Sequence, residues 1–274
     1  MLRNIREFLR IHLHEMTDSP LNIAELARRQ LSDYDAGSPG TIFGEGLVLD
    51  EAAAYRVASH VAELRTARGE RIIGYKVGCT SAVIQRQLGI DHFVFGRLFD
   101  TERHADGTKL SAARYDHLAI EGELAVRLAV DLEPGDGLDE LLLGDFGAIF
   151  PVIELHNYII RGPLATAGEL IANNALHAGF VAPAAVTHHV SAIQGDMTIL
   201  VGGQIADQCD SRQLQDTVTS SLRWLANTLP NHDNRLKAGD VVLTGSVCRL
   251  IPVDPPCHVR VHSPADRVEV EIVR

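Results

Sequence analysis

The sequence is poor in aromatic residues and cysteines, and it contains no long apolar run. Aromatic residues make up 5% of the 274 residues while apolar residues reach 46%, which is typical of an ordinary soluble α/β or α+β protein. No apolar stretch approaches the length of a membrane span, so we expect no membrane association. The four cysteines form no CxxC pair, which indicates reduced thiols and argues against both a zinc site and disulfides.

Positive charge is also scarce. The chain carries 25 lysines and arginines against 36 acidic residues, a net charge of −11, and it has no basic cluster, so we expect no nucleic-acid partner. Arg3, Arg6, Glu7 and Arg10 interrupt the first apolar residues, a pattern unlike a secretory signal. These features together predict a cytoplasmic location.

The periodicity of apolar residues divides the chain near residue 70. Residues 1–70 are predicted to form a helical N-terminal region, in which Asp50 caps a helix that ends at Gly69. Residues 71–274 are predicted to form a catalytic domain rich in strands, with an extended loop over 93–103 and a hairpin over 197–206. Strands and helices do not alternate regularly, which argues against a TIM barrel or a Rossmann fold.

The most informative segment is an apolar run that contains two acidic residues, Glu121 and Glu123. On a strand, side chains two residues apart point to the same face. Two carboxylates side by side on a buried strand repel each other and are costly to desolvate. A hard divalent cation between them is the simplest remedy, so the spacing indicates a metal site.

A third acid, Glu154, interrupts a second apolar run and could reach the same ion from a neighbouring strand. Three carboxylates leave about half of an octahedral Mg²⁺ or Mn²⁺ shell for water and substrate. The alternative is that Glu121 and Glu123 lie on an exposed edge strand and that Glu154 pairs with an arginine. Spacing alone leaves both interpretations open.

Several segments in order resemble the fumarylacetoacetate hydrolase superfamily, and within it the branch of 2-hydroxypenta-2,4-dienoate hydratases and 4-oxalocrotonate decarboxylases. The matching segments, from about Asp50 to the C-terminus, are Gly74-Tyr75-Lys76-Val77-Gly78-Cys79-Thr80-Ser81, Gln85-Arg86-Gln87-Leu88-Gly89, Phe95-Gly96-Arg97-Leu98-Phe99-Asp100, Glu121-Gly122-Glu123, Pro151-Val152-Ile153-Glu154, Asn174-Ala175, Gly179-Phe180, Trp224-Leu225-Ala226-Asn227 and Leu236-Lys237-Ala238-Gly239-Asp240-Val241-Val242-Leu243-Thr244-Gly245-Ser246.

The resemblance implies an α+β fold, a mixed β-sheet roll of the fumarylacetoacetate hydrolase C-terminal-domain type with a smaller helical N-terminal part. It implies that Glu121, Glu123 and Glu154 bind Mg²⁺ or Mn²⁺ and that Lys76 lies beside the substrate. It also implies a homo-oligomer, with a pathway decarboxylase or aldolase as a possible partner.

Further residues are candidates for contact with a 2-oxo acid. Lys76 could bind the substrate carboxylate or, with its pKa lowered by burial, carry a proton, and Asp100 could pair with it or relay a proton. Ser246 and the preceding Thr244 are candidates for substrate binding, although a plain strand turn explains them equally well. Asn174 could bond the substrate or cap a helix.

The chain departs from this branch at two places. The branch commonly follows its third metal glutamate with Asp-Ser-Arg, where this chain has Asn157-Tyr158-Ile159. The usual Asp-Asn pair is here Asn173-Asn174. Both changes remove charge near the site, and we therefore expect a longer or less anionic 2-oxo acid as the substrate.

The function that these observations predict is a metal-dependent hydratase, a lyase that adds water to a 2-hydroxy-2,4-dienoate in aromatic hydrocarbon catabolism. The alternatives are a 4-oxalocrotonate-type decarboxylase, a C–C bond hydrolase of the same superfamily, and a non-catalytic relative that binds a small acid. The hydrolase would need a histidine–acid pair to activate water, for which His92 or His104 could serve.

Overall fold

The computed structural model describes residues 21–135, 147–162, 166–184, 195–263 and 266–274. The first part of the predicted helical region, residues 1–20, lies outside these ranges. The later part is helical as predicted, with α2 (Ile23–Asp35), the short α3 (Thr41–Gly44) and α4 (Glu51–Ala67). Asp50 caps α4 because its side chain accepts a hydrogen bond from the backbone N–H of Ala53.

The larger of two sheets carries the motif residues. Its strands follow the order β2-β1-β10-β5-β6-β7-β3, and β11 pairs with β5 beyond the end of β10. Their bounds are β1 (Ile72–Gly78), β2 (Val94–Phe99), β3 (Arg103–Ala105), β5 (Leu118–Leu128), β6 (Gly147–Asn157), β7 (His177–Ala182), β10 (Val241–Leu243) and β11 (Ile251–Pro252).

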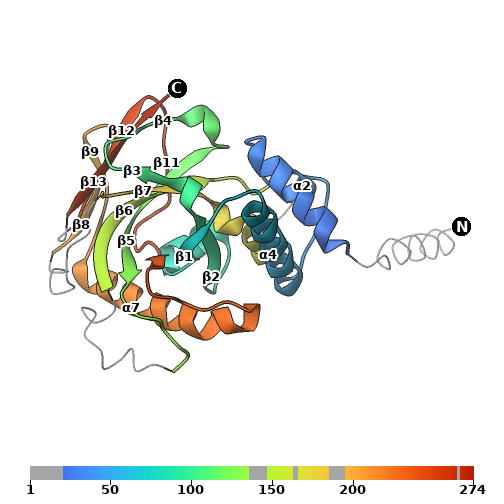
Figure 1. Ribbon diagram of the computed structural model, residues 1–274. Helices are drawn as coiled ribbons and strands as arrows, with labels where there is room; N and C mark the ends of the chain where they lie inside the picture. Colours follow the sequence, from blue (N-terminus) through green and yellow to red (C-terminus); the bar gives the residue numbers. More distant parts are fainter. Residues whose placement is uncertain (1–20, 136–146, 163–165, 185–194, 264–265) are drawn as a thin grey trace, which may run out of the picture.

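A smaller sheet packs against the outer side of the first (Figure 1). Its strands follow the order β4-β13-β12-β8-β9, with β8 and β9 joined at Gly202-Gly203 as the predicted hairpin. Their bounds are β4 (Lys109–Ser111), β8 (Met197–Val201), β9 (Gln204–Cys209), β12 (Cys257–His262) and β13 (Arg267–Val273). The two mixed sheets with their surrounding helices confirm the predicted α+β class.

Gly122 marks where the two sheets press together. A Cβ at this position would lie 2.9 Å from the side chain of Ile199 on β8 and 3.1 Å from Val261 on β12. Gly122 therefore faces the smaller sheet, and its neighbours Glu121 and Glu123 face the opposite way.

Helices cover the other surfaces of the larger sheet. The longest, α7, runs along the lower edge of the roll in Figure 1, while α2 and α4 lie at its side, beyond β1 and β2. The remaining helical elements are α5 (Ala82–Leu88), α6 (Ala167–Ala172) and α7 (Ser211–Thr228), with the 3₁₀ turns η1 (Asp100–Glu102), η2 (Ala112–Arg114), η4 (Asn174–Leu176) and η6 (Leu229–His232).

Two sequence predictions about this part of the chain were wrong. The expected loop over 93–103 contains the strand β2, whose six residues are all buried. Gly96 and Arg97 break its apolar run, but pairing with β1 and packing against α6 and η4 hold it in the sheet.

Cys209 and Cys248 form a disulfide, whereas Cys79 and Cys257 are free. The cysteine spacing gave no sign of this pair, because 39 residues separate the two in sequence.

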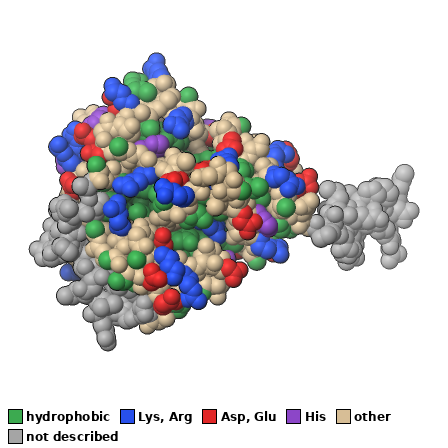
Figure 2. All heavy atoms as spheres, in the orientation of Figure 1, with side chains coloured by type: hydrophobic (Ala, Val, Ile, Leu, Met, Phe, Trp, Pro, Cys, Tyr) green, Lys and Arg blue, Asp and Glu red, His purple; other side chains and the backbone are tan. Residues whose placement is uncertain are grey.

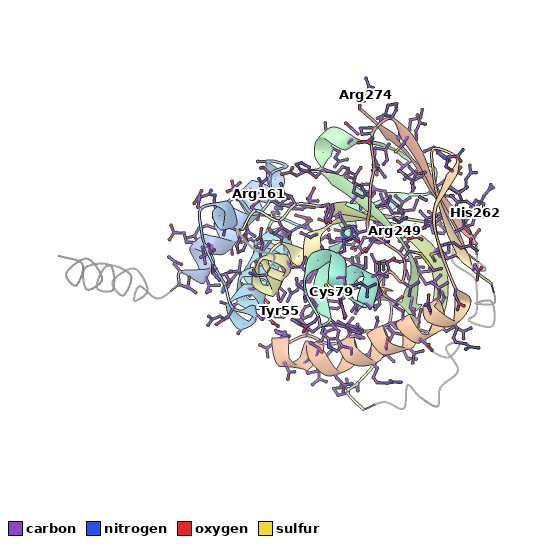
Figure 3. All side chains as sticks on the ribbon, turned by 180° about the vertical axis from the view of Figure 1, so that it is seen from behind. Tyr55, Cys79, Arg161, Arg249, His262 and Arg274 are labelled. Carbon is purple, nitrogen blue, oxygen red and sulfur yellow. A yellow bond between two sulfur atoms is a disulfide. The ribbon has the colours of Figure 1, made fainter. Side chains whose placement is uncertain are left out.

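Polar side chains fasten the N-terminal helices to the sheets. Arg161, labelled in Figure 3, donates hydrogen bonds to the carbonyl of Pro39 and the hydroxyl of Ser38 and pairs with Asp116. Tyr55 of α4, labelled in the same view, stacks on Phe95 of β2 with ring centroids 4.6 Å apart. One apolar core thus includes helices and strands alike, and the division into units 1–70 and 71–274 stays a prediction.

The surface in Figure 2 carries acidic and basic side chains interspersed with one another. Among the described residues, no helix is both long and apolar enough to cross a membrane.

Gly168 offers a test of this packing. A Cβ there would lie 2.0 Å from the carbonyl oxygen of Leu49, so Gly168→Ala must push α6 away from the segment that precedes α4. We expect a loss of roughly 1–3 kcal/mol in the free energy of unfolding, measured by urea denaturation. Gly44→Ala is the matched control, because its Cβ would meet the Cβ of Arg161 at an ordinary 3.7 Å. Equal stability of the two variants would contradict the close approach.

Candidate active site

The three glutamates lie together on one face of the larger sheet. Glu121 of β5 stands directly opposite Glu154 of β6, and Glu123 follows two residues along on the same face. The exposed fraction is 5% for Glu121, 1% for Glu123 and 0% for Glu154. The strand β5 pairs with β6 on one side and with β10 and β11 on the other, so the exposed-edge interpretation was wrong.

Lys76 of β1 supplies a positive charge to this cluster. Its Nζ lies 3.4 Å from Oε1 of Glu154, and the residue is 3% exposed. Burial alone would lower the pKa of Lys76, but the charges of Glu154, Glu121 and Glu123 raise it above its ordinary value. The neighbouring glutamates thus favour the protonated, positively charged form of Lys76. The alternative role as a proton carrier would have needed a lowered pKa.

The three carboxylates do not share one environment. Burial and the charges of Glu154 and Glu121 raise the pKa of Glu123 well above its ordinary range. Burial also opposes the ionisation of Glu154, yet Lys76 and the neighbouring His156 and His177 hold its pKa well below that range. Glu123 is fixed in place by the backbone N–H of Gly245, which donates to its Oε2 at 2.8 Å.

Two buried histidines complete the cluster, and sequence reasoning missed both. Nδ1 of His177 lies 2.6 Å from Oε1 of Glu154, and Nε2 of His156 lies 3.2 Å from Oε2 of Glu121. Burial would lower the pKa of His156, but Glu154 and Glu121 raise it to about 9. The Glu-x-His spacing of 154 and 156 puts both side chains on the same face of a strand, and this signal was available in the sequence.

Beyond His177 lies a second buried set of charges. Glu102 of η1 lies 3.8 Å from Nε2 of His177, accepts a hydrogen bond from Tyr34 and pairs with Arg65 at 2.7 Å. Arg65 also pairs with Glu70. His177 therefore connects the glutamate cluster to the ionic contacts that join α2 and α4 to the sheet.

The cluster fits a divalent metal ion. Ligand atoms of Glu121, Glu154 and His156 lie within 4.8 Å of one another. Oε1 of Glu123, Oε2 of Glu154 and both ring nitrogens of His156 are buried and have no hydrogen-bond partner in the structure. Buried polar atoms without partners are costly, and an ion among them would remove that cost.

The loop after β10 runs beside the glutamate strand β5 and forms hydrogen bonds with its backbone. Thr244 donates its hydroxyl to the carbonyl of Leu124, and the single hydroxyl proton of Ser246 can be donated to the carbonyl of either Gly122 or Cys248. The Ser246 hydroxyl also accepts from the N–H of Cys248. Both side chains thus lie next to the cluster but bond the backbone, and their contact with substrate stays a prediction.

Two other candidates are engaged elsewhere. Asn174 is the first residue of η4, after the end of α6, and its side chain exchanges two hydrogen bonds with the backbone of Arg97 on β2. Asp100 pairs with Arg71 at 2.8 Å. Arg71 immediately precedes β1, at the end of the strand that is far from Lys76. The predicted pairing of Asp100 with Lys76 was therefore wrong, because Lys76 is four positions along the strand from Ile72 at that end, roughly 13 Å.

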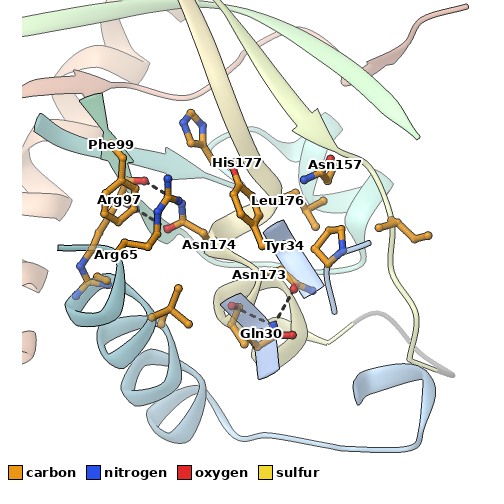
Figure 4. A pocket seen from close by; sticks show the side chains of 16 residues that line it. Gln30, Tyr34, Arg65, Arg97, Phe99, Asn157, Asn173, Asn174, Leu176 and His177 are labelled. Carbon is orange, nitrogen blue, oxygen red and sulfur yellow. Dashed lines mark hydrogen bonds between the residues drawn. The ribbon is translucent and has the colours of Figure 1, made fainter. Parts of the chain in front are cut away.

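A pocket lies on the other side of His177, between α2, α4 and the sheet (Figure 4). We call it the helix-side pocket. It is lined by Gln30, Tyr34, Pro39, Ala58, Val61, Ala62, Arg65, Arg97, Phe99, Asn157, Ile159, Ala172, Asn173, Asn174, Leu176 and His177. Leu176 also lines a small cavity beside Lys76, Glu121 and His156, so the two spaces are neighbours. Asn157, Ile159 and Asn173, where this chain departs from the pattern of its branch, all line the helix-side pocket.

Comparison with known proteins finds relatives over most of the chain, although no family model matches it. The 2-hydroxyhexa-2,4-dienoate hydratase of Comamonas testosteroni is 32% identical over 207 residues, which cover 73% of this chain and 77% of the relative. A 2-keto-4-pentenoate hydratase of Burkholderia vietnamiensis is 28% identical over 74% of this chain and 79% of its own length.

A solved structure shows the same fold. The 4-oxalocrotonate decarboxylase of Pseudomonas putida G7, complexed with magnesium and adipate, superimposes with a TM-score of 0.82 at 21% identity, covering 94% of this chain and 99% of that one. The sequence identity to the hydratases and the shared fold agree with the motifs that surround the glutamate cluster. The chain belongs to the family of the 2-hydroxyhexa-2,4-dienoate and 2-keto-4-pentenoate hydratases, and it has the fold of the 4-oxalocrotonate decarboxylase.

Proposed function

We propose that this protein is a divalent-metal-dependent hydratase, a hydro-lyase that converts a 2-hydroxy-2,4-dienoate, through its 2-oxo tautomer, into a 4-hydroxy-2-oxo acid. The observation that carries the proposal is the buried cluster of Glu121, Glu123, Glu154 and Lys76 in a chain whose relatives are hydratases. Mg²⁺ or Mn²⁺ is the proposed cofactor, held by the three glutamates. A homo-oligomer and a decarboxylase or aldolase partner stay predictions.

The residues of the cluster can hold the acid end of such a substrate. A bound divalent ion would act as a Lewis acid and stabilise the negative charge of the enolate. Lys76, kept positive by its glutamate neighbours, would bind the substrate carboxylate and favour the same charge. The apolar side chains of Ile84, Leu88 and Leu170 around the site cavity would limit access of bulk water and strengthen these interactions.

The overall reaction is balanced by one water. The dienol first becomes the conjugated enone when its hydroxyl proton is lost and C5 gains a proton. Water then adds across the C3–C4 double bond, with its oxygen at C4 and a proton at C3. No oxidant or further reactant is required, so binding, orientation and proton transfer are the tasks left to the protein.

The helix-side pocket is the proposed site for the end of the substrate remote from the carboxylate. Ile159 stands where the branch commonly has an arginine, and Val61, Ala62 and Leu176 add apolar surface. Arg65 in this wall is already paired with Glu70 and Glu102. We infer a preference for a neutral tail, and the hexadienoate in the name of the Comamonas relative supports a tail longer than that of the pentadienoate.

One observation favours the decarboxylase as a second candidate. Arg97 is 4% exposed, lines the helix-side pocket and bonds Ser59, yet within the described residues it makes no salt bridge with a carboxylate. A diacid could place its second carboxylate there. Release of CO₂ from a 2-hydroxymuconate-type diacid, without hydration of a monoacid, would establish this alternative.

The hydratase reaction can be tested with freshly generated 2-hydroxypenta-2,4-dienoate and 2-hydroxyhexa-2,4-dienoate. We expect the dienol absorbance to fall with Mg²⁺ or Mn²⁺ but not after EDTA, and the product to be one water heavier by mass. Glu154→Gln should lower kcat/KM at least about a hundredfold, because even outer partners of metal ligands contribute 10–100-fold. Glu63→Gln, on the exposed face of α4, is the control. Metal-independent turnover would refute the proposed centre.

Lys76→Met tests the charge balance without an assay of turnover. Removing one partner of a buried pair leaves the other unpaired, so we expect a loss of about 3–5 kcal/mol in unfolding free energy in EDTA. Mn²⁺ should recover part of this loss, since a bound cation stabilises the folded state. Lys109→Met removes an exposed pair with Glu271 and should cost under about 1 kcal/mol. Equal stability of the two variants in EDTA would show that Lys76 does not balance the glutamates.

Ile159→Arg tests the proposed tail site. An arginine here would add a further cation to the Arg65 and Arg97 that already line the helix-side pocket, and it should shift preference from neutral-tailed to acid-tailed dienoates. We expect the ratio of kcat/KM for hexadienoate over a diacid to fall about tenfold or more, which corresponds to about 1.4 kcal/mol. Ile159→Leu preserves the apolar wall and is the control. An unchanged ratio in Ile159→Arg would place the tail elsewhere.

A further inference from the structure

His156 is placed among the glutamates by the register of two strands. It follows Glu154 by two residues on β6 and stands opposite Ala119 of β5, which itself precedes Glu121 by two. All these side chains therefore share one face. The single methyl group of Ala119 leaves space across the strand for the imidazole ring.

The ring of His156 is buried without a satisfactory partner. The residue is 3% exposed, and neither ring nitrogen has a hydrogen-bond partner among the residues that the structure describes. Nε2 nevertheless points into the cluster, 3.2 Å from Oε2 of Glu121 and 3.4 Å from Oε2 of Glu154, and the latter oxygen also lacks a hydrogen bond. An unpaired polar atom is costly to bury, so the convergence of these atoms indicates a bound ligand.

The spacing of these atoms matches adjacent positions around one ion. Metal–donor distances of about 2.1 Å put neighbouring ligand atoms of an octahedron ~3.0 Å apart and opposite ones ~4.2 Å apart. The separations of 3.2 and 3.4 Å are close to the first value. Ligand atoms of Glu121, Glu154 and His156 all lie within 4.8 Å of one another.

We propose that His156 is a nitrogen ligand of the metal centre, in addition to the carboxylates of Glu121, Glu123 and Glu154. This inference rests on the metal dependence proposed above but adds a residue outside the three glutamates. An imidazole is a poor ligand for Mg²⁺ and a good one for transition metals, so the mixed oxygen and nitrogen set selects Mn²⁺, Fe²⁺ or Zn²⁺ over Mg²⁺. The competing explanation is that His156 is only a counter-cation between two glutamates.

Pulsed EPR of bound Mn²⁺ separates the two explanations. A directly coordinated imidazole gives a ¹⁴N modulation in the electron spin echo, which we expect from the unaltered protein. The modulation should disappear in His156→Val and in His156→Gln, the second variant guarding against a folding defect in the first. His177→Val is the matched control: His177 is equally buried and contacts Glu154, but the proposal gives it no bond to the ion, so its loss should leave the modulation intact.

Metal affinity provides an independent measurement. Titration calorimetry should show that His156→Val weakens Mn²⁺ binding about tenfold or more while Mg²⁺ binding changes less. Bound Mn²⁺ without ¹⁴N modulation, or a modulation that survives in both His156 variants, would overturn the ligand role and leave the hydratase proposal standing. Failure of the unaltered protein to bind Mn²⁺ would refute the metal centre itself, and the His156 ligand with it.

Discussion

The burial of three carboxylates on one face of a sheet is the constraint on which the rest of this structure depends. Glu121, Glu123 and Glu154 together expose almost no surface, and their mutual repulsion is strong where water is excluded. Several polar groups nearby compensate that charge. Lys76 and two histidines approach as donors or cations, and the Gly245 N–H holds one carboxylate still.

The same constraint extends into the helical part of the molecule. His177 contacts Glu154 on one side and approaches Glu102 on the other, and Glu102 in turn pairs with Arg65 of α4. The guanidinium of Arg65 also lies 3.6 Å from the centre of the Phe99 ring. The helices before the first strand are therefore tied electrostatically to the site, and they supply one wall of the helix-side pocket.

Local patterns in the sequence predicted much of this arrangement. Two glutamates spaced by one residue in an apolar run had to share a strand face, and Asp50 and Gly69 marked the limits of α4. Order among many short motifs then indicated the family, which the relatives bear out. These signals succeed because they depend on neighbours in the chain.

Features that depend on tertiary contacts were not accessible in the same way. The strand β2 is secured by pairing with β1 and by packing against η4, and the Cys209–Cys248 pair joins segments far apart in sequence. Likewise, Asp100 finds Arg71 instead of Lys76. His156 is an exception, because its spacing from Glu154 was visible in the sequence. Only the strand register, which places His156 opposite Ala119 and Glu154 opposite Glu121, shows that the ring lies among the glutamates.

Gly122, between the two glutamates of β5, links this chemistry to the far sheet. Because Ile199 and Val261 already occupy the space that a side chain would need, the backbone under the carboxylates rests directly on the smaller sheet. The position of the strand that carries Glu121 and Glu123 is thus set by Ile199 and Val261, which lie on the opposite face from the carboxylates. The geometry of the site is consequently coupled to the hydrophobic packing of β8 and β12. Substitutions in those two strands can change the positions of the glutamates while the metal-binding residues themselves stay the same.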